Sequence, residues 1–393
     1  MINAIFNTKK FLIPTLWILV IAVLAIIIVR TDYAARENDS RLYSIFTQQL
    51  AGKPFSKINT LEWQGSSAFS ETETPYVRDH LIGQFIFPVI IAKLGYSSKH
   101  AIYLANIIYK ALSLYFIYLL VSYYFEKNIA LLTTILIQLT PISLNYQMRA
   151  NHEPLLLLLT LASLYCSIRV KDSKFFSIPT FLATQLCFLV KGIAFIPIMP
   201  IIFIANIFNQ ENIRKPNIKQ LLILSAICFS TILTAIAYEY LFRSNTGHSF
   251  FEKYIQVQIM GRSFAEDKSN IFLLSNIKTF TYYIGRVLVY SMPWSLIAII
   301  ILLRNKFKLQ ITDKSKNLYL TLLLSSLIYI LVFSISSRTA SRYIYPAYYL
   351  LNIITIIYFF EQLNLKERYK FISKETTPLT LFFILTISKL IFS

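Results

Sequence analysis

The sequence predicts an all-α, polytopic membrane protein, and three observations lead to this fold class. Hydrophobic residues make up 56% of the 393 positions, and the mean hydropathy is +0.56. Apolar segments long enough to cross about 30 Å of hydrocarbon recur along the chain. Lys and Arg concentrate in short connections between these segments, which explains most of the net charge of +19 as cytoplasmic loops. Anionic lipid headgroups or a phosphorylated substrate would account for the rest.

The first apolar segment, 11–29, is about nineteen residues long, whereas the apolar core of a cleaved signal peptide has about 7–15. We therefore predict a first transmembrane helix with its N-terminus in the cytoplasm. Further spans bring the total to about eleven, within one membrane-embedded domain covering residues 1–393. The later spans are expected at 101–124, 128–144, 153–169, 175–190, 192–208, 219–241, 281–303, 317–336, 343–361 and 377–392.

Charge distribution sets the orientation of these spans. The basic connections 169–174, 210–220, 304–316 and 362–375 become cytoplasmic, as the positive-inside rule requires. The outer connections are then 30–100, 145–152, 242–280 and 337–342, which contain most acidic residues and all four histidines. The protein is expected in the plasma (inner) membrane, with loops 30–100 and 242–280 forming an active-site face on the outer, periplasmic side.

The large first outer loop, 30–100, is predicted to carry two surface helices. Residues 41–52 have apolar side chains at helical spacing, and Gly52-Lys53-Pro54 ends the segment. Residues 81–95 are apolar but too short to cross a membrane comfortably, which favours an interfacial or re-entrant helix. These helices would form a shelf around the acidic residues of the loop.

Charged residues in this loop are the first candidates for chemistry. Glu37, Asp39 and Arg41 follow the first span, and Arg78-Asp79-His80 comes about forty residues later. A glycine-rich phosphate loop and the common metalloprotease and serine hydrolase motifs are absent from the sequence. With only eight glycines, the sequence also argues against a nucleotide-binding loop.

These features resemble the integral-membrane glycosyltransferases of the GT-C fold, in particular the branch with aminoarabinose transferase and the protein O-mannosyltransferases. That branch has an acid after the first span, a tyrosine four residues later and a small-residue turn, which Asp39, Tyr43 and Gly52 match. In that branch, a basic or His residue further along the chain precedes a Pro-Pro-Leu motif. The corresponding segment here, Arg78-Asp79-His80-Leu81, lacks the two prolines. Other matches are Arg149 with Glu153-Pro154, Lys191-Gly192, Pro293-Trp294, and Arg342-Tyr343 with Tyr345-Pro346.

The resemblance implies transfer of a sugar from a polyprenyl-phosphate donor to a glycolipid, polysaccharide or protein acceptor, without a cofactor or nucleic acid. A carboxylate near the membrane surface would activate the acceptor, and Arg or Lys would hold the phosphate. The expected catalytic residues are Asp39, Glu37 and Asp79. The expected phosphate ligands are Arg41, Arg149, Lys191 and Arg342, and the expected substrate contacts are Tyr43, His80, Tyr343 and Tyr345. The histidine spacing matches no metal motif, so no metal site is expected.

Structural alternatives accompany each of these roles. Asp39 and Asp79 would also serve as helix N-caps, and basic residues near span ends commonly snorkel to the interface. Lys110 lies in the middle of a span, where an unpaired ammonium is costly. An O-antigen polymerase or ligase is an alternative enzyme, although those usually carry their large outer loop late in the chain. A lipid-linked sugar transporter or flippase is the alternative outside enzymes, but no internal repeat supports it.

Overall fold

The computed structural model describes residues 38–63, 74–146, 149–209, 217–260, 272–306, 313–336 and 339–362. Apart from one isolated bridge between Glu62 and Tyr76, the regular structure in these ranges is helical, so the all-α prediction is confirmed. The α-helices are α2 (Asn38–Ala51), α3 (Gly83–Lys93), α4 (Ala101–Tyr124), α5 (Lys127–Leu136), α6 (Pro141–Tyr146), α7 (Glu153–Arg169), α8 (Ser177–Val190), α9 (Phe195–Phe208), α10 (Ile218–Thr246), α11 (Phe250–Tyr254), α13 (Phe272–Tyr290), α14 (Trp294–Arg304), α15 (Asp313–Ser334) and α16 (Tyr345–Gln362). Shorter 3₁₀ segments are Phe55–Lys57, Ile137–Leu139, Lys174–Phe176, Gly192–Ala194 and Ser341–Ile344, and Ile255–Met260 is a π-helix.

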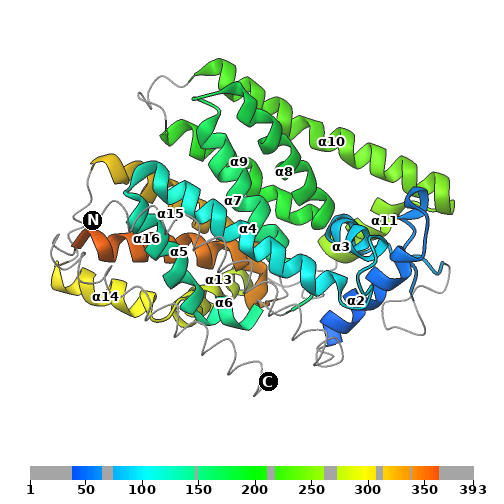
Figure 1. Ribbon diagram of the computed structural model, residues 1–393, viewed down its shortest axis with the longest axis horizontal. Coiled ribbons are helices and arrows are strands. Elements are labelled where there is room, and N and C mark those ends of the chain that lie inside the picture. Colours follow the sequence, from blue (N-terminus) through cyan, green and yellow to red (C-terminus); the bar gives the residue numbers. More distant parts are fainter. Residues whose placement is uncertain are drawn as a thin grey trace.

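Helix α7 forms the centre of the bundle. Its side chains from Glu153 to Ile168 are all buried, and it packs against α4, α8, α9 and α16. A helix that is apolar on every side needs neighbours around its whole circumference, which explains this central position. Figure 1 shows α10 running along one side of the bundle, while α2, α3 and α11 gather at one end. The candidate active site described below lies at this end of the bundle.

The helices agree with membrane insertion, but the predicted number of spans is not confirmed. Four described helices are long and apolar enough to cross a membrane, or five if α13 and α14 count as one broken span. These two helices meet at 96°, so the expected straight span 281–303 is bent near Pro293, whose ring cannot continue a regular helix. The expected span 128–144 is also divided, between α5 and α6. The expected spans 11–29 and 377–392 lie outside the described residues.

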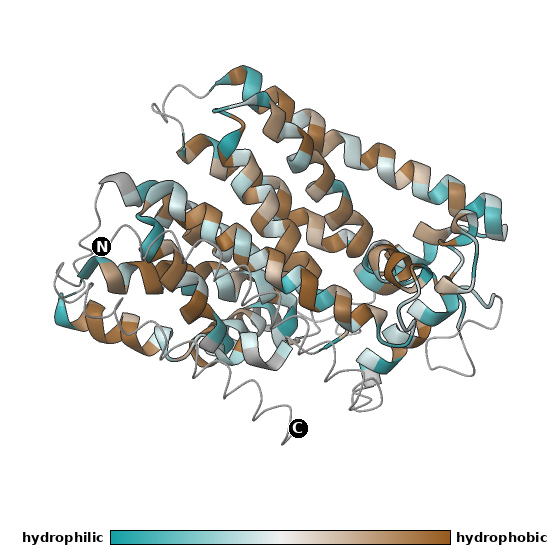
Figure 2. Cartoon of the chain, viewed as in Figure 1, coloured by the Kyte–Doolittle hydropathy of each residue, from teal (hydrophilic) through white to brown (hydrophobic). Residues whose placement is uncertain are grey.

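Apolar side chains on the outside of the bundle are consistent with contact with lipid. On α10, Leu222, Phe229, Leu233 and Ile236 are all more than half exposed, and Figure 2 shows hydrophobic residues over most of the helix lengths. Such a surface is costly in water and ordinary in a bilayer. The polar residue Asn217 caps the start of α10 by accepting the N–H groups of Lys219 and Gln220.

Both predicted surface helices are present as α2 and α3. Tyr43, Phe46 and Leu50 recur at helical spacing and bury one face of α2 against α3 and α4. With 11 residues, α3 is too short to cross the hydrocarbon. It lies against α8 instead, so closely that a Cβ added at Gly83 would stand 2.6 Å from the carbonyl carbon of Leu189. This close contact places the shelf beside the C-terminal end of α8.

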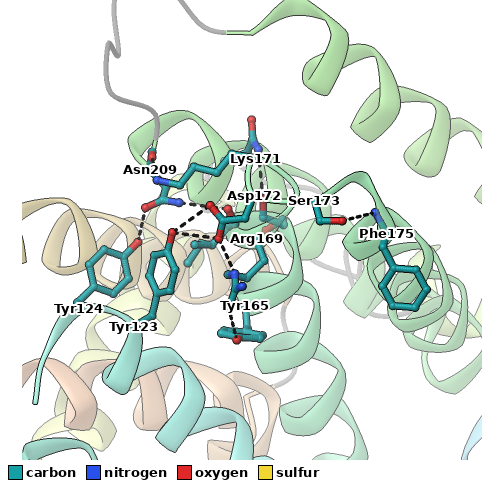
Figure 3. A network of polar contacts seen from close by, with 12 residues as sticks. Tyr123, Tyr124, Tyr165, Arg169, Lys171, Asp172, Ser173, Phe175 and Asn209 are labelled. Carbon is teal, nitrogen blue, oxygen red and sulfur yellow. Dashed lines mark hydrogen bonds and ion pairs between the residues drawn. The ribbon is translucent and has the colours of Figure 1, made fainter. Parts of the chain in front are cut away.

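A polar network ties together the opposite ends of the long helices (Figure 3). Tyr124 at the end of α4 donates a hydrogen bond to Asn209 after α9 (2.8 Å), and Lys171 after α7 donates to the Asn209 carbonyl (2.8 Å). Arg169 ion-pairs with Asp172 in the same corner. Because α7 has 17 residues, this network is about 25 Å from the N-terminal end of α7.

Lys110 lies in the middle of α4, where the sequence placed it, and it is buried with two hydroxyl groups beside its amine. It donates to Ser143 Oγ at 2.8 Å and to the Tyr349 hydroxyl, and its Nζ lies 4.3 Å from the centre of the Tyr349 ring. Within the described part of the chain, no carboxylate forms an ion pair with Lys110. Hydroxyl oxygens and an aromatic face therefore replace the water that the amine loses.

Candidate active site

The site is organised by Arg342, which lies between two carboxylates at one end of the bundle. Its Nη1 forms an ion pair with Asp39 Oδ2, although the two residues are 303 positions apart. Its Nε lies 3.8 Å from Glu153 Oε1. Asp39 is in the first turn of α2, Glu153 begins α7, and Arg342 lies in the 3₁₀ segment before α16. One guanidinium therefore connects three elements that are distant in sequence.

Glu153 is the most deeply buried charged residue of the site, with 1% of its side chain exposed. Among the residues that the structure describes, none donates a hydrogen bond to either carboxylate oxygen, and none pairs with the two buried amide atoms of the neighbouring Asn151. A buried carboxylate is costly unless cations or donors compensate it. Arg342 and Lys191 supply positive charge, and His152 Nε2 lies 3.4 Å from Glu153 Oε1.

Lys191 provides the second cation of the site. Its Nζ lies 2.9 Å from His152 Nε2 and 4.6 Å from the centre of the Tyr343 ring. The residue stands at the end of α8, where a 3₁₀ turn starting at Gly192 redirects the chain into α9. A basic residue that only snorkelled would extend along the surface. Lys191 instead faces a histidine and an aromatic ring inside the cluster.

A second row of polar groups lies beside the carboxylates. Tyr43 is one helical turn after Asp39 on the same face of α2, and its hydroxyl lies 3.4 Å from His80 Nε2. His80 Nδ1 is 2.8 Å from Asp79 Oδ1. If Nδ1 donates to Asp79, Nε2 is able to accept a hydrogen bond from Tyr43. Burial, and then the negative charge of Glu153, raise the pKa of Tyr43, so its phenol stays neutral at physiological pH.

The segment after α10 holds this second row in place. Gln258 Nε2 donates to the Asp79 carbonyl at 3.0 Å, and Arg78 Nη1 donates to the Ser249 carbonyl at 3.0 Å. Loops 30–100 and 242–280 are therefore in contact through residues of their described parts. The N-cap alternative for Asp79 is wrong, because the start of α3 has no side-chain cap and Asp79 binds His80 instead.

Most of the residues proposed from the sequence are in this cluster. Asp39, Tyr43, Asp79, His80, Lys191, Arg342 and Tyr343 all take part in the contacts above. Arg149 is nearby, with its guanidinium 4.6 Å from the centre of the Tyr146 ring. Tyr345, three residues after Arg342, is fully buried, and its hydroxyl forms a hydrogen bond with the Tyr349 hydroxyl (3.1 Å).

Arg41 and Glu37 are placed neither in the cluster nor beside it. Arg41 is exposed on α2 and makes none of the contacts described above. Residues two positions apart on a helix point to different sides, so Arg41 cannot share a face with Asp39. Glu37 lies outside the described residues.

Glu153 and His152 are central to the cluster, although the sequence patterns assign a role to neither of them. In the segment before α7, those patterns single out Arg149, with Glu153 only as its acidic neighbour. The signal was available, because an acidic residue at the start of an otherwise apolar span is costly and usually has a function. Among the described residues, no three His, Cys, Asp or Glu side chains are grouped so that they would bind a metal ion.

Comparison with solved structures shows the fold. ArnT from Cupriavidus metallidurans bound to undecaprenyl phosphate aligns with 89% of this chain at a TM-score of 0.65 and 13% identity. The apo state of the same protein aligns with 85% of the chain at 0.56 and 14% identity. The chain has a GT-C fold. It covers only 60% and 57% of those two ArnT chains, respectively.

A family model supports the same resemblance. Residues 81–234 match the family described as dolichyl-phosphate-mannose-protein mannosyltransferase. This matched region begins just before α3 and ends within α10. No curated protein sequence matches the chain. The matched region contains Glu153 and Lys191, whereas Asp39 and Arg342 lie on either side of it. In this GT-C fold, the cluster therefore combines residues inside and outside the matched family region.

Proposed function

We propose that this chain transfers a sugar from a polyprenyl-phosphate donor to an acceptor hydroxyl or amine at one face of the membrane. The observation that carries the proposal is the cluster of Asp39, Arg342, Glu153 and Lys191 at the end of a GT-C helix bundle. Two cations beside two carboxylates match the needs of this reaction. A departing phosphate requires positive charge, and an acceptor requires a base.

Asp39 is the proposed base, because about 44% of its side chain is exposed while Glu153 is almost fully buried. In the proposed step, Asp39 takes the proton of the acceptor as the acceptor atom bonds to the anomeric carbon. The bond between that carbon and the phosphate oxygen breaks, and the electron pair leaves with the polyprenyl phosphate. Inversion at the anomeric carbon is what the resemblance implies.

Lys191 and Arg342 are the proposed phosphate ligands. Arg342 presents a planar fork that binds phosphate oxygens in pairs, whereas Lys191 acts as a point charge. The negative charge of Glu153 would offset the mutual repulsion of these two cations and so keep them close together. Tyr43, His80 and Asp79 would contact the sugar or the acceptor. The prenyl chain would pack against the exposed apolar side chains of α8 and α10.

An enzyme assay in lipid tests this proposal. Purified protein in nanodiscs receives a panel of polyprenyl-phosphate sugars together with an envelope extract from a strain lacking the gene. We expect consumption of one donor, release of polyprenyl phosphate and a mass increase in one envelope component that the deletion strain lacks. Movement of an intact lipid-linked sugar from one leaflet of a vesicle membrane to the other, without release of polyprenyl phosphate, would instead identify a flippase.

The proposed orientation places the site on the outer, periplasmic side of the inner membrane, with the N-terminus inside. Reporter fusions or cysteine labelling should then place 304–316 and 362–375 in the cytoplasm, because these loops are dense in Lys and Arg. The same measurements should place 55–75 and 250–270 outside. Cytoplasmic labelling of 55–75 would put the cluster on the wrong side and remove this orientation.

A further inference from the structure

Two buried side chains outside the cluster hold the turn that leads into Glu153. Asn106 of α4 is 3% exposed, and its Nδ2 donates to the carbonyls of both Arg149 and Asn151, each at 2.7 Å. Ser40 of α2 is fully buried, and its Oγ accepts the Ala150 N–H at 3.0 Å. Two peptide groups of the turn, 149–150 and 151–152, are therefore held by side chains of two different helices.

These contacts connect the backbones that carry the two carboxylates. Ser40 directly follows Asp39, and the turn continues without a break through His152 to Glu153. Arg342 contacts both carboxylates only while their separation matches the span of one guanidinium. Because Asn106 anchors the turn and Ser40 ties it to α2, any shift at either contact changes that separation.

We propose that Asn106 and Ser40 are positioning residues, which set the separation of Asp39 and Glu153 and thereby the place of Arg342. They act through the 149–152 turn and touch neither carboxylate in the contacts described. The inference rests on the proposed function, since it assigns them a role in turnover. A misplacement of about 1 Å in an active site lowers the rate by as much as about a hundredfold, so small movements of this turn matter.

The test compares Asn106→Leu with Asn206→Leu in lipid. Asn206 is an equally buried amide on α9 that donates to the Ser167 carbonyl (3.2 Å) and to Gln220 (3.3 Å), away from the cluster. Both variants lose similar hydrogen bonds, so both should lower the Tm. We expect Asn106→Leu to lower kcat by about tenfold to a hundredfold, and Asn206→Leu to stay within about twofold of wild type.

Ser40→Ala and Ser44→Ala form a second matched pair. Ser44 is one turn further along α2, also buried, and donates to the Lys99 carbonyl at 2.5 Å. We expect Ser40→Ala to lower kcat and Ser44→Ala to leave it unchanged. Because Ser40 and Asn106 act through one turn, their double variant should lose less activity than the product of the single losses. Multiplicative losses, or equal losses in both matched pairs, would overturn the proposal.

Hydrogen exchange separates a failure of this inference from a failure of the proposed function. In Asn106→Leu and Ser40→Ala, we expect faster deuterium uptake in peptides covering 149–153, with no change there in Asn206→Leu or Ser44→Ala. If the wild type transfers no sugar, the proposed function fails whatever the exchange shows. If the wild type is active and exchange at 149–153 does not change, the positioning role fails alone.

Discussion

Asp39→Asn is expected to lower turnover by about 10²–10⁴ while leaving expression and membrane insertion intact. The amide has the size of the carboxylate and retains an oxygen facing Arg342, but it cannot take a proton from the acceptor. Because Asp39 is about 44% exposed, the loss of its ion pair should cost little stability. The measurement is the release of polyprenyl phosphate under saturating donor and acceptor.

The structure offers a matched control for this variant. Asp172 also pairs with an arginine, Arg169, and is similarly exposed at 33%, but it lies in the network at the opposite end of α7. Asp172→Asn should therefore retain wild-type turnover. Glu37→Gln should lose less activity than Asp39→Asn. Near-normal activity in Asp39→Asn together with loss in Glu37→Gln would move the role of the base to Glu37.

Replacement of Arg342 is expected to have the second largest effect. Arg342→Ala removes the group that joins Asp39 to Glu153, and we expect activity to fall by about 10²–10³. Arg342→Lys keeps the charge, but the single ammonium nitrogen of lysine cannot replace the two separate guanidinium nitrogens that contact Asp39 and Glu153. The Lys variant should therefore lose some activity and the Ala variant much more.

Donor-dependent kinetics distinguish the possible roles of Arg342. If it binds phosphate equally in substrate and transition state, the variants should chiefly raise KM for the lipid donor. If its interaction strengthens as the phosphate leaves, kcat should fall instead. Arg243→Ala is the control, because Arg243 is 66% exposed and forms only a 4.0 Å pair with Glu239. Wild-type kinetics in both Arg342 variants would remove this residue from the site.

Much of the helical structure could be predicted from the sequence, because it depends on properties of continuous segments. Apolar length and the distribution of Lys and Arg predicted a helical membrane protein, and the expected span 101–124 has the same bounds as α4. The surface helices α2 and α3 were also predicted, since side-chain periodicity and length are properties of a continuous segment. The spacing of Asp39 and Tyr43 likewise placed both on one face of α2.

Contacts between distant segments could not be derived in this way. The pairing of Asp39 with Arg342 joins residues 303 positions apart, and neither local sequence encodes the other's position. The bend between α13 and α14 was missed because hydropathy measures composition and not direction. The sequence places Glu153 only at the polar edge of a span, whereas packing buries it beside Arg342 with 1% of its side chain exposed. The sequence alone thus determined which segments become helices and where charged groups stand along them. Only the tertiary structure decided which charges meet, because their burial and separation depend on how the whole bundle packs.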